Sequence, residues 1–166
     1  MRPIILTTFL VCTVLACSTN PRVRRPKFPD DFKLLNSWQT FKHAVNSSDT
    51  TTLVSISHSC ILCGPCSAPH DDRFISAEEF YRTDFRTIFN NRFLSMMNDS
   101  SKVWAEYDNY STYPERDSCL GTNAGNNKLA DIFVNVGSRD GEGLAVLIHF
   151  VKTETSFKFY GVSTMP

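Results

Sequence analysis

The sequence predicts an α+β domain, in which two or three N-terminal helices pack in a curved antiparallel sheet of about four strands. Two observations favour this class. Between residues 34 and 97 most apolar residues recur every three or four positions, which is the period of an amphipathic helix. From residue 103 onward, short apolar runs are separated by turn-forming residues, which is typical of strands. Because the helical half precedes the strand half, we expect α+β rather than an alternating α/β fold.

The chain begins with the pattern of an export signal. Arg2 supplies a positive charge, and the apolar run 4–15 is too short for a permanent membrane-spanning helix. The small residue Ala16 precedes Cys17. This ending resembles the lipobox of bacterial lipoproteins, which implies that residues 1–16 are a signal peptide and that Cys17 carries a lipid. The alternative is an ordinary secretory signal that ends next to a cysteine.

Residues 17–30 are predicted to form a flexible basic tether. They contain four basic residues, and the acidic residues begin only at Asp30. Such a segment suits either a position near anionic lipid headgroups or a solvated linker. From Asp30 onward, 12 basic residues face 17 acidic ones, a net charge of −5. We expect residues 31–166 to form a single domain, whose acidic character argues against nucleic acid as a partner.

Three helices are predicted before residue 100. The first has apolar residues at helical spacing from Leu34 to Val45 and ends near Asn46. The segment 49–57 is rich in β-branched residues, as in a strand, but the cap at Asp49 favours a short helix. Ser76-Ala77-Glu78-Glu79 is a capping box that begins a longer helix, with apolar residues as far as Met96.

Four strands are predicted after residue 100. The second and third are joined by a hairpin turn over residues 139–143, and a long irregular stretch, 108–128, follows the first. In the third predicted strand, apolar residues occupy odd and even positions alike, as in a central strand covered on both faces. The expected strands are Val103–Tyr107, Leu129–Val136, Leu144–Val151 and Phe157–Val162.

The element order resembles the nuclear transport factor two-like (cystatin-like) superfamily, and more narrowly small lipoproteins of Bacteroidota. The residues that carry the resemblance are the lipobox, Trp38–Val45 with Asp49 and Leu53, Ser76–Phe80, and Phe157–Gly161. The resemblance implies a cone-like domain, in which a curved sheet wraps a long helix. It does not decide function, because such folds serve enzymes, ligand pockets and interaction domains alike.

Apart from the signal peptide and the lipid-carrying Cys17, the chain has four cysteines: Cys60, Cys63, Cys66 and Cys119. An even number of cysteines in an oxidising compartment predicts disulfides. We therefore expect two structural bridges, at least one of which joins the cysteine segment 60–66 to the irregular stretch that contains Cys119.

A redox hypothesis competes with this interpretation. Cys63-Gly64-Pro65-Cys66 is identical to the active-site tetrapeptide of thioredoxins, where Cys63 would be the nucleophile and Cys66 the resolving thiol. A thioredoxin helix follows its motif directly. Here Pro69 comes three residues later and the next helix signal is Ser76.

A metal site is the third interpretation. Cys60, Cys63 and Cys66 with Cys119, His58 or His70 offer ligands for a tetrahedral zinc ion. These residue types suit zinc in charge and softness, whereas an iron–sulfur cluster is disfavoured in a chain exported unfolded. The structural interpretation needs no cofactor.

His149 is the remaining candidate, as a general base lining the interior of the cone or as a hydrogen-bonded core residue. The sequence favours a membrane-anchored protein of the cell envelope, on the periplasmic or outer-membrane face. We expect it to bind a small ligand or another envelope protein through its concave sheet, rather than to be an enzyme. A tethered thiol–disulfide oxidoreductase using Cys63 and Cys66 is the alternative, and an isomerase or hydratase near His149 comes third.

Overall fold

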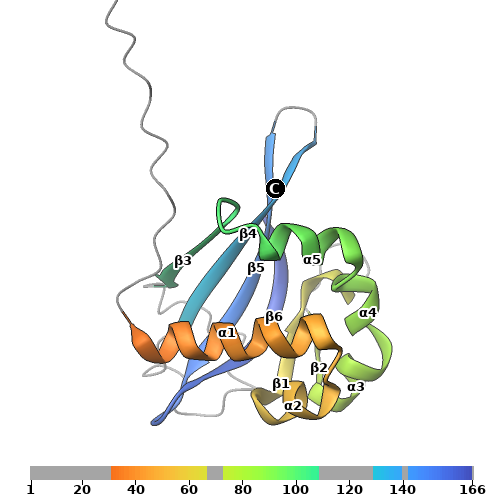
Figure 1. Ribbon diagram of the computed structural model, residues 1–166. Coiled ribbons are helices and arrows are strands. Elements are labelled where there is room, and N and C mark those ends of the chain that lie inside the picture. Colours follow the sequence, from red (N-terminus) through yellow and green to blue (C-terminus); the bar gives the residue numbers. More distant parts are fainter. Residues whose placement is uncertain (1–30, 67–72, 109–128, 140–141, 166) are drawn as a thin grey trace, which may run out of the picture.

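The computed structural model describes residues 31–66, 73–108, 129–139 and 142–165 (Figure 1). Its helices and strands form an α+β domain, which confirms the predicted class. The helices are α1 (Phe32–Ser47), α2 (Thr50–Ser55), α3 (Ala77–Thr83), α4 (Phe85–Ile88), α5 (Asn91–Asn98) and the 3₁₀ turn η1 (Gly64–Cys66). The strands are β1 (Ser57–Cys63), β2 (Arg73–Ser76), β3 (Val103–Asp108), β4 (Leu129–Arg139), β5 (Glu142–Lys152) and β6 (Phe157–Met165).

The described strands form one six-stranded sheet in the order β2-β1-β6-β5-β4-β3. Every neighbouring pair is antiparallel except β1 and β6, which are parallel. The predicted strands β3 to β6 are present, but the expectation of about four antiparallel strands was wrong in number and in direction. Two strands were missed: β1, which contains Cys60 and Cys63 of the segment that the sequence had placed in a loop, and β2, which follows that segment.

β1 was missed because its pairing partner is distant in sequence. Cys63 pairs with Val162 and Leu62 with Gly161, about a hundred residues further along the chain. The two strands approach so closely that a Cβ on Gly161 would overlap the carbonyl oxygen of Leu62 and lie 2.6 Å from the Leu62 Cβ. Glycine at position 161 therefore permits the parallel pairing of β1 and β6.

Both N-terminal helices begin at aspartate caps. The Asp31 carboxylate accepts from the backbone N–H of Lys33 and Leu34, and Asp49 accepts from that of Thr52. The second cap confirms the short helix that was favoured for residues 49–57. Among the described residues no helix combines the length and the hydropathy that a membrane span requires.

The helix predicted from Ser76 is divided into α3, α4 and α5. The Ser76 hydroxyl accepts from the Glu79 N–H, as a capping box requires. The helix is interrupted at Asp84 and again at Asn90, whose side chain bonds to the Thr87 carbonyl and caps α5 through the Phe93 N–H. Such local side-chain bonds compete with the backbone bonds of a continuous helix.

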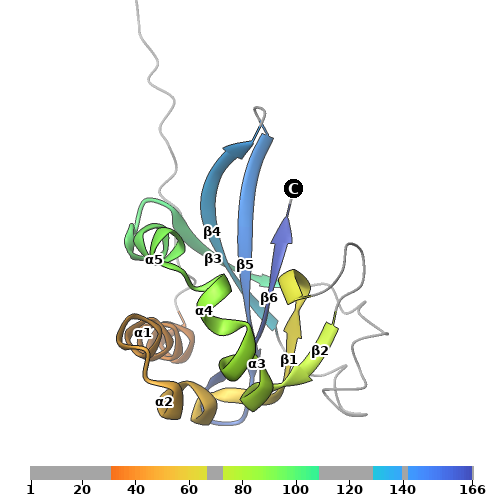
Figure 2. The same ribbon diagram turned by 90° about the vertical axis from the view of Figure 1, so that its right-hand side faces the viewer.

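The helices lie against one face of the sheet, as Figure 2 shows for α1 and the α3–α5 series. Phe41 of α1 is fully buried at the centre of this layer, with its ring 4.7 Å from that of Phe159 and 5.7 Å from that of Phe89. The space between helices and sheet is filled by side chains of this kind. The residues of this core that come from α1, from α3–α5 and from the junction of α4 with α5 are Leu34, Trp38, Phe41, Ala44, Val45, Ala77, Phe80, Tyr81, Phe85, Phe89, Phe93 and Met97.

Candidate functional site

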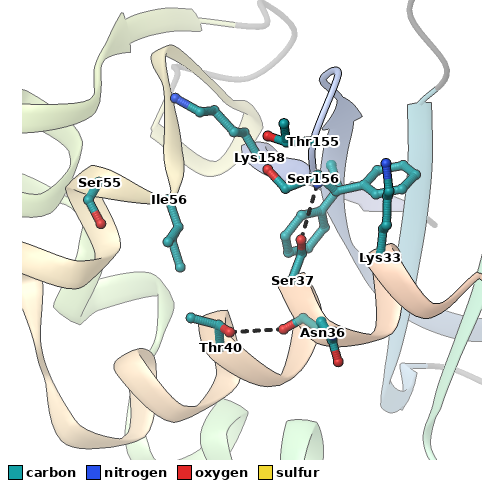
Figure 3. Close-up of a pocket in the computed structure, with 11 residues that line it drawn as sticks. Lys33, Asn36, Ser37, Thr40, Ser55, Ile56, Thr155, Ser156 and Lys158 are labelled. Carbon is teal, nitrogen blue, oxygen red and sulfur yellow. Dashed lines mark hydrogen bonds between the residues drawn. The ribbon is translucent and has the colours of Figure 1, made fainter.

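A hollow in the described surface lies at the rim of the domain, between α1, the end of α2 and the β5–β6 turn (Figure 3). Its volume is about 360 Å³, within the range of small-molecule sites. The described residues that line it are Lys33, Asn36, Ser37, Thr40, Ser55, Ile56, Phe150, Thr155, Ser156, Phe157 and Lys158. We call this feature the rim hollow.

The rim hollow combines positive charge with hydroxyl groups and an apolar floor. Lys33 and Lys158 are its charged residues, and none of its described lining residues is acidic. Figure 3 shows the two lysines at separate edges and Ile56 directed into the space between them. The partly exposed Ile56 supplies apolar surface, and the rings of Phe150 and Phe157 lie almost wholly buried beside the hollow.

Local hydrogen bonds hold the walls of the rim hollow in place. The Ser37 hydroxyl accepts from the Phe157 N–H at 3.1 Å and so joins α1 to the start of β6. The Lys33 ammonium donates to the Glu154 carbonyl at 3.2 Å, and the Thr40 hydroxyl donates to the Asn36 carbonyl at 2.9 Å. These bonds order two of the walls, while Lys33 keeps further donors for a ligand.

Among the described residues, none of the sequence candidates lines the rim hollow. It forms where α1 meets a turn about 120 residues further along the chain, and its polar residues are ordinary surface types. No sequence motif marked them in advance. One face of the sheet is covered by the helices and filled by the core. The expectation that a ligand binds to a concave face of the sheet stays a prediction.

The cysteine segment contains a disulfide between Cys63 and Cys66, with the two Cα atoms 5.3 Å apart. Cys60 is also disulfide-bonded. Of the other cysteine candidates, Cys17 and Cys119 lie outside the described residues, as does His70. A sulfur held in a disulfide is not a thiolate, so in this state Cys63 and Cys66 cannot bind zinc.

The surroundings of the disulfide differ from those that the redox hypothesis requires. Cys63 is fully buried, whereas Cys66 is partly exposed. The 3₁₀ turn that holds Gly64, Pro65 and Cys66 has three residues, and the segment where a thioredoxin helix would follow lies outside the described residues. The buried sulfur is therefore the one that the thioredoxin pattern would make the attacking nucleophile.

His58 lies two residues before Cys60 on β1 and faces the ring of Tyr160 at 5.8 Å. The backbone N–H of Cys60 is 3.3 Å from its Nδ1. Burial lowers the pKa of His58, and the nearby Lys158 lowers it further, so the ring is neutral at pH 7. Within the described ranges, no three His, Cys, Asp or Glu side chains gather as a metal site.

His149 lies on the face of the sheet that is turned away from the helices. Its neighbours in β5, Ile148 and Phe150, belong to the core under the helices, so strand alternation directs His149 to the other side. There its Nδ1 is 2.6 Å from Oδ1 of Asp131, and its Nε2 is 2.7 Å from Oγ of Ser163. The sequence singled out His149 but missed both partners, because the register of three strands brings them together.

Comparison with known proteins gives no match: no family model, curated protein or solved structure is significantly similar to this chain.

Proposed function

We propose that this chain is a ligand-binding domain of the cell envelope, anchored through Cys17, and that the rim hollow takes a small anionic ligand with an apolar part. The observation that carries the binding proposal is the pairing of two lysines with an apolar floor in a hollow without acidic lining residues. An ammonium group forms charge-assisted hydrogen bonds with a carboxylate or phosphate. The partly exposed apolar side chain of Ile56 favours an organic ligand over an inorganic ion.

The volume and the ordered walls of the hollow suit a small ligand. A volume of about 360 Å³ accommodates a small molecule but not a peptide. Because Ser37 and Lys33 already bond across the hollow, little ordering is needed when a ligand enters. A wall ordered in advance lowers the entropic cost of binding.

Binding is tested on the full chain in detergent by titration with phenyl phosphate and with benzoate, followed by NMR chemical shifts. We expect shifts at Lys33, Thr40 and Lys158, and no comparable shifts with benzyl alcohol, which lacks the charge. The double variant Lys33→Gln/Lys158→Gln should bind at least tenfold more weakly, because each lost charge-assisted bond contributes about 1.5–3 kcal/mol.

Lys102→Gln provides the matched control, since this exposed lysine precedes β3 and is not a lining residue of the hollow. It should leave both titrations unchanged. Equal binding by the double variant, or shifts confined to another surface, would overturn the proposal.

The anchor is proposed from the lipobox resemblance and is tested separately. Detergent partitioning of the protein expressed in a bacterial host should disappear in the Cys17→Ala variant, because a diacyl group alone gives stable membrane attachment. Unchanged partitioning would show that Cys17 carries no lipid.

A further inference from the structure

A chain of hydrogen bonds crosses three strands on the face of the sheet opposite the helices. It runs from Asp131 of β4 to His149 of β5 and on to Ser163 of β6. Asp131 and His149 are direct register partners, and Ser163 lies one diagonal step away because His149 pairs with Gly161. Neither the rim hollow nor the cysteine chemistry uses these three residues.

The bonding pattern fixes the proton positions in the neutral imidazole. An ionised Asp131 carboxylate can only accept, so His149 Nδ1 carries the proton and donates it across 2.6 Å. The lone pair is then on Nε2, which accepts from the Ser163 hydroxyl across 2.7 Å. A base oriented by a carboxylate and hydrogen-bonded to a hydroxyl is the arrangement that activates a serine nucleophile.

Of the three groups, the base and its carboxylate partner are shielded from solvent and the hydroxyl is accessible, as such chemistry needs. The side chains of His149 and Asp131 are only 6% and 12% exposed, so water competes little for their bond. Ser163 is partly exposed, and the residues that follow it, Thr164 and Met165, are exposed. A substrate can therefore approach this series of hydrogen bonds from the Ser163 hydroxyl.

The 3₁₀ turn of the cysteine segment lies directly against Ser163. A Cβ added to Gly64 would be 3.3 Å from the Ser163 Cα and 3.4 Å from its Cβ. The Cys63–Cys66 disulfide closes this turn around Gly64 and so fixes the backbone beside the serine. Gly64 and the disulfide act as positioning elements in this arrangement.

An apolar row leads away from Ser163 across the same face. Ser163 pairs with Leu147, Leu147 with Phe133, and Phe133 with Trp104. The rings of Phe133 and Trp104 stack with their centroids 5.0 Å apart, and both residues are partly exposed. Three steps between strands span about 14 Å, which is the length of an extended acyl chain of about eleven carbons.

We propose that Ser163, His149 and Asp131 form a catalytic site that hydrolyses carboxylic esters with an apolar acyl chain, which lies along Leu147, Phe133 and Trp104. This goes beyond ligand binding at the rim hollow and does not depend on it.

In the first half of the reaction, Ser163 Oγ attacks the ester carbonyl carbon and its proton passes to His149 Nε2. The bond between the carbonyl carbon and the alcohol oxygen then breaks, and the alcohol leaves with that proton. In the second half, water attacks the acyl-serine and gives a proton to His149. The carboxylic acid leaves as the proton returns to Ser163 Oγ, so ester and water become acid and alcohol.

The nucleophile is tested by treating the full chain with a fluorophosphonate probe, which phosphonylates an activated serine and releases fluoride. We expect one adduct per chain, mapped by mass spectrometry to Ser163. Ser163→Ala and His149→Gln should remove it, and Asp131→Asn should slow labelling by on the order of 10³-fold. Ser59→Ala, at an exposed serine of β1, is the control and should label like the natural chain.

Circular dichroism of each variant separates a lost nucleophile from a lost fold. If Ser163→Ala fails to fold, Ser163→Cys replaces it as the test, since a thiol keeps the shape and should be acylated by p-nitrophenyl acetate. An unlabelled natural chain, labelling that persists in His149→Gln, or an adduct on another serine would each overturn the proposal.

The acyl preference is tested with p-nitrophenyl octanoate against p-nitrophenyl acetate. We expect octanoate to have the lower KM, and Trp104→Ala to raise the ratio of the KM for octanoate to the KM for acetate about tenfold. If Trp104 had only a structural role, its replacement would change the KM for both substrates alike. That result would contradict the assigned acyl row.

Discussion

Tyr107 of β3 donates a hydrogen bond of 2.6 Å from its Oη to Oδ2 of Asp31, the residue that caps the start of α1. The contact joins residues 76 positions apart and ties the first helix to the edge strand of the sheet (Figure 1). It raises the pKa of Tyr107, together with burial, to about 12, and it is the main reason that the pKa of Asp31 is lowered from 3.8.

This bond predicts a stability contribution with two pH limits. The neutral phenol is favoured by folding, so its contribution is complete below pH 10 and is lost as the pH rises toward 12. The ionised carboxylate is also favoured by folding, so its contribution is present above about pH 4 and is lost as the pH falls through the lowered pKa of Asp31.

The measurement is chemical denaturation of the natural chain and of Tyr107→Phe from pH 2 to pH 12. At pH 7 the variant should be less stable by about 0.5–1.5 kcal/mol, and the difference should shrink at both ends of the range. A difference that stays constant with pH would mean that the hydroxyl contributes through packing alone.

Gly161→Ala should destabilise the domain by about 1–3 kcal/mol, because the added methyl group overlaps the backbone of Leu62 and pushes β1 from β6. Gly64→Ala is the graded comparison, since its nearest contact would be 3.3 Å and the neighbouring atoms need to move less. The free energy of unfolding from urea titrations checks the order. If both variants lost the same free energy of unfolding, the strands would accommodate the methyl group at position 161 by small movements.

Phe41→Ala should lower the free energy of unfolding by about 3–5 kcal/mol, because it removes a fully buried ring that contacts aromatic side chains from helices and sheet. Phe32→Ala removes the same ring at a position that is 75% exposed, and should change the unfolding free energy by about 0.5 kcal/mol or less. Thermal and urea unfolding of both variants measure the contrast. Similar losses would contradict the placement of Phe41 in the core.

Alkylation after limited reduction should modify Cys66 before Cys63, because Cys66 is partly exposed and Cys63 is fully buried. Without reductant, neither cysteine should react. Peptide mass mapping with isotopically labelled iodoacetamide follows both sites in one sample. Faster modification of Cys63 than of Cys66 would contradict this prediction and would support the thioredoxin-like redox hypothesis.

Local signals accounted for much of the fold. Asp49 and Ser76 mark the starts of helices because a side-chain cap acts within three residues. The third predicted strand, 144–151, was recognisable because both of its faces are apolar. The break at Asn90 was missed, since apolar residues continue at four-residue spacing through Phe85, Phe89 and Phe93 although the helix does not.

Long-range pairing decided the rest. The sequence by itself determined the α+β class, the helix caps at Asp49 and Ser76 and the four C-terminal strands, because these depend on neighbours a few residues apart. Only the tertiary structure placed β1 beside β6 and brought Asp131 and Ser163 to His149. Strand register follows from the packing of the whole sheet, and a shift of one residue would turn His149 toward the opposite face.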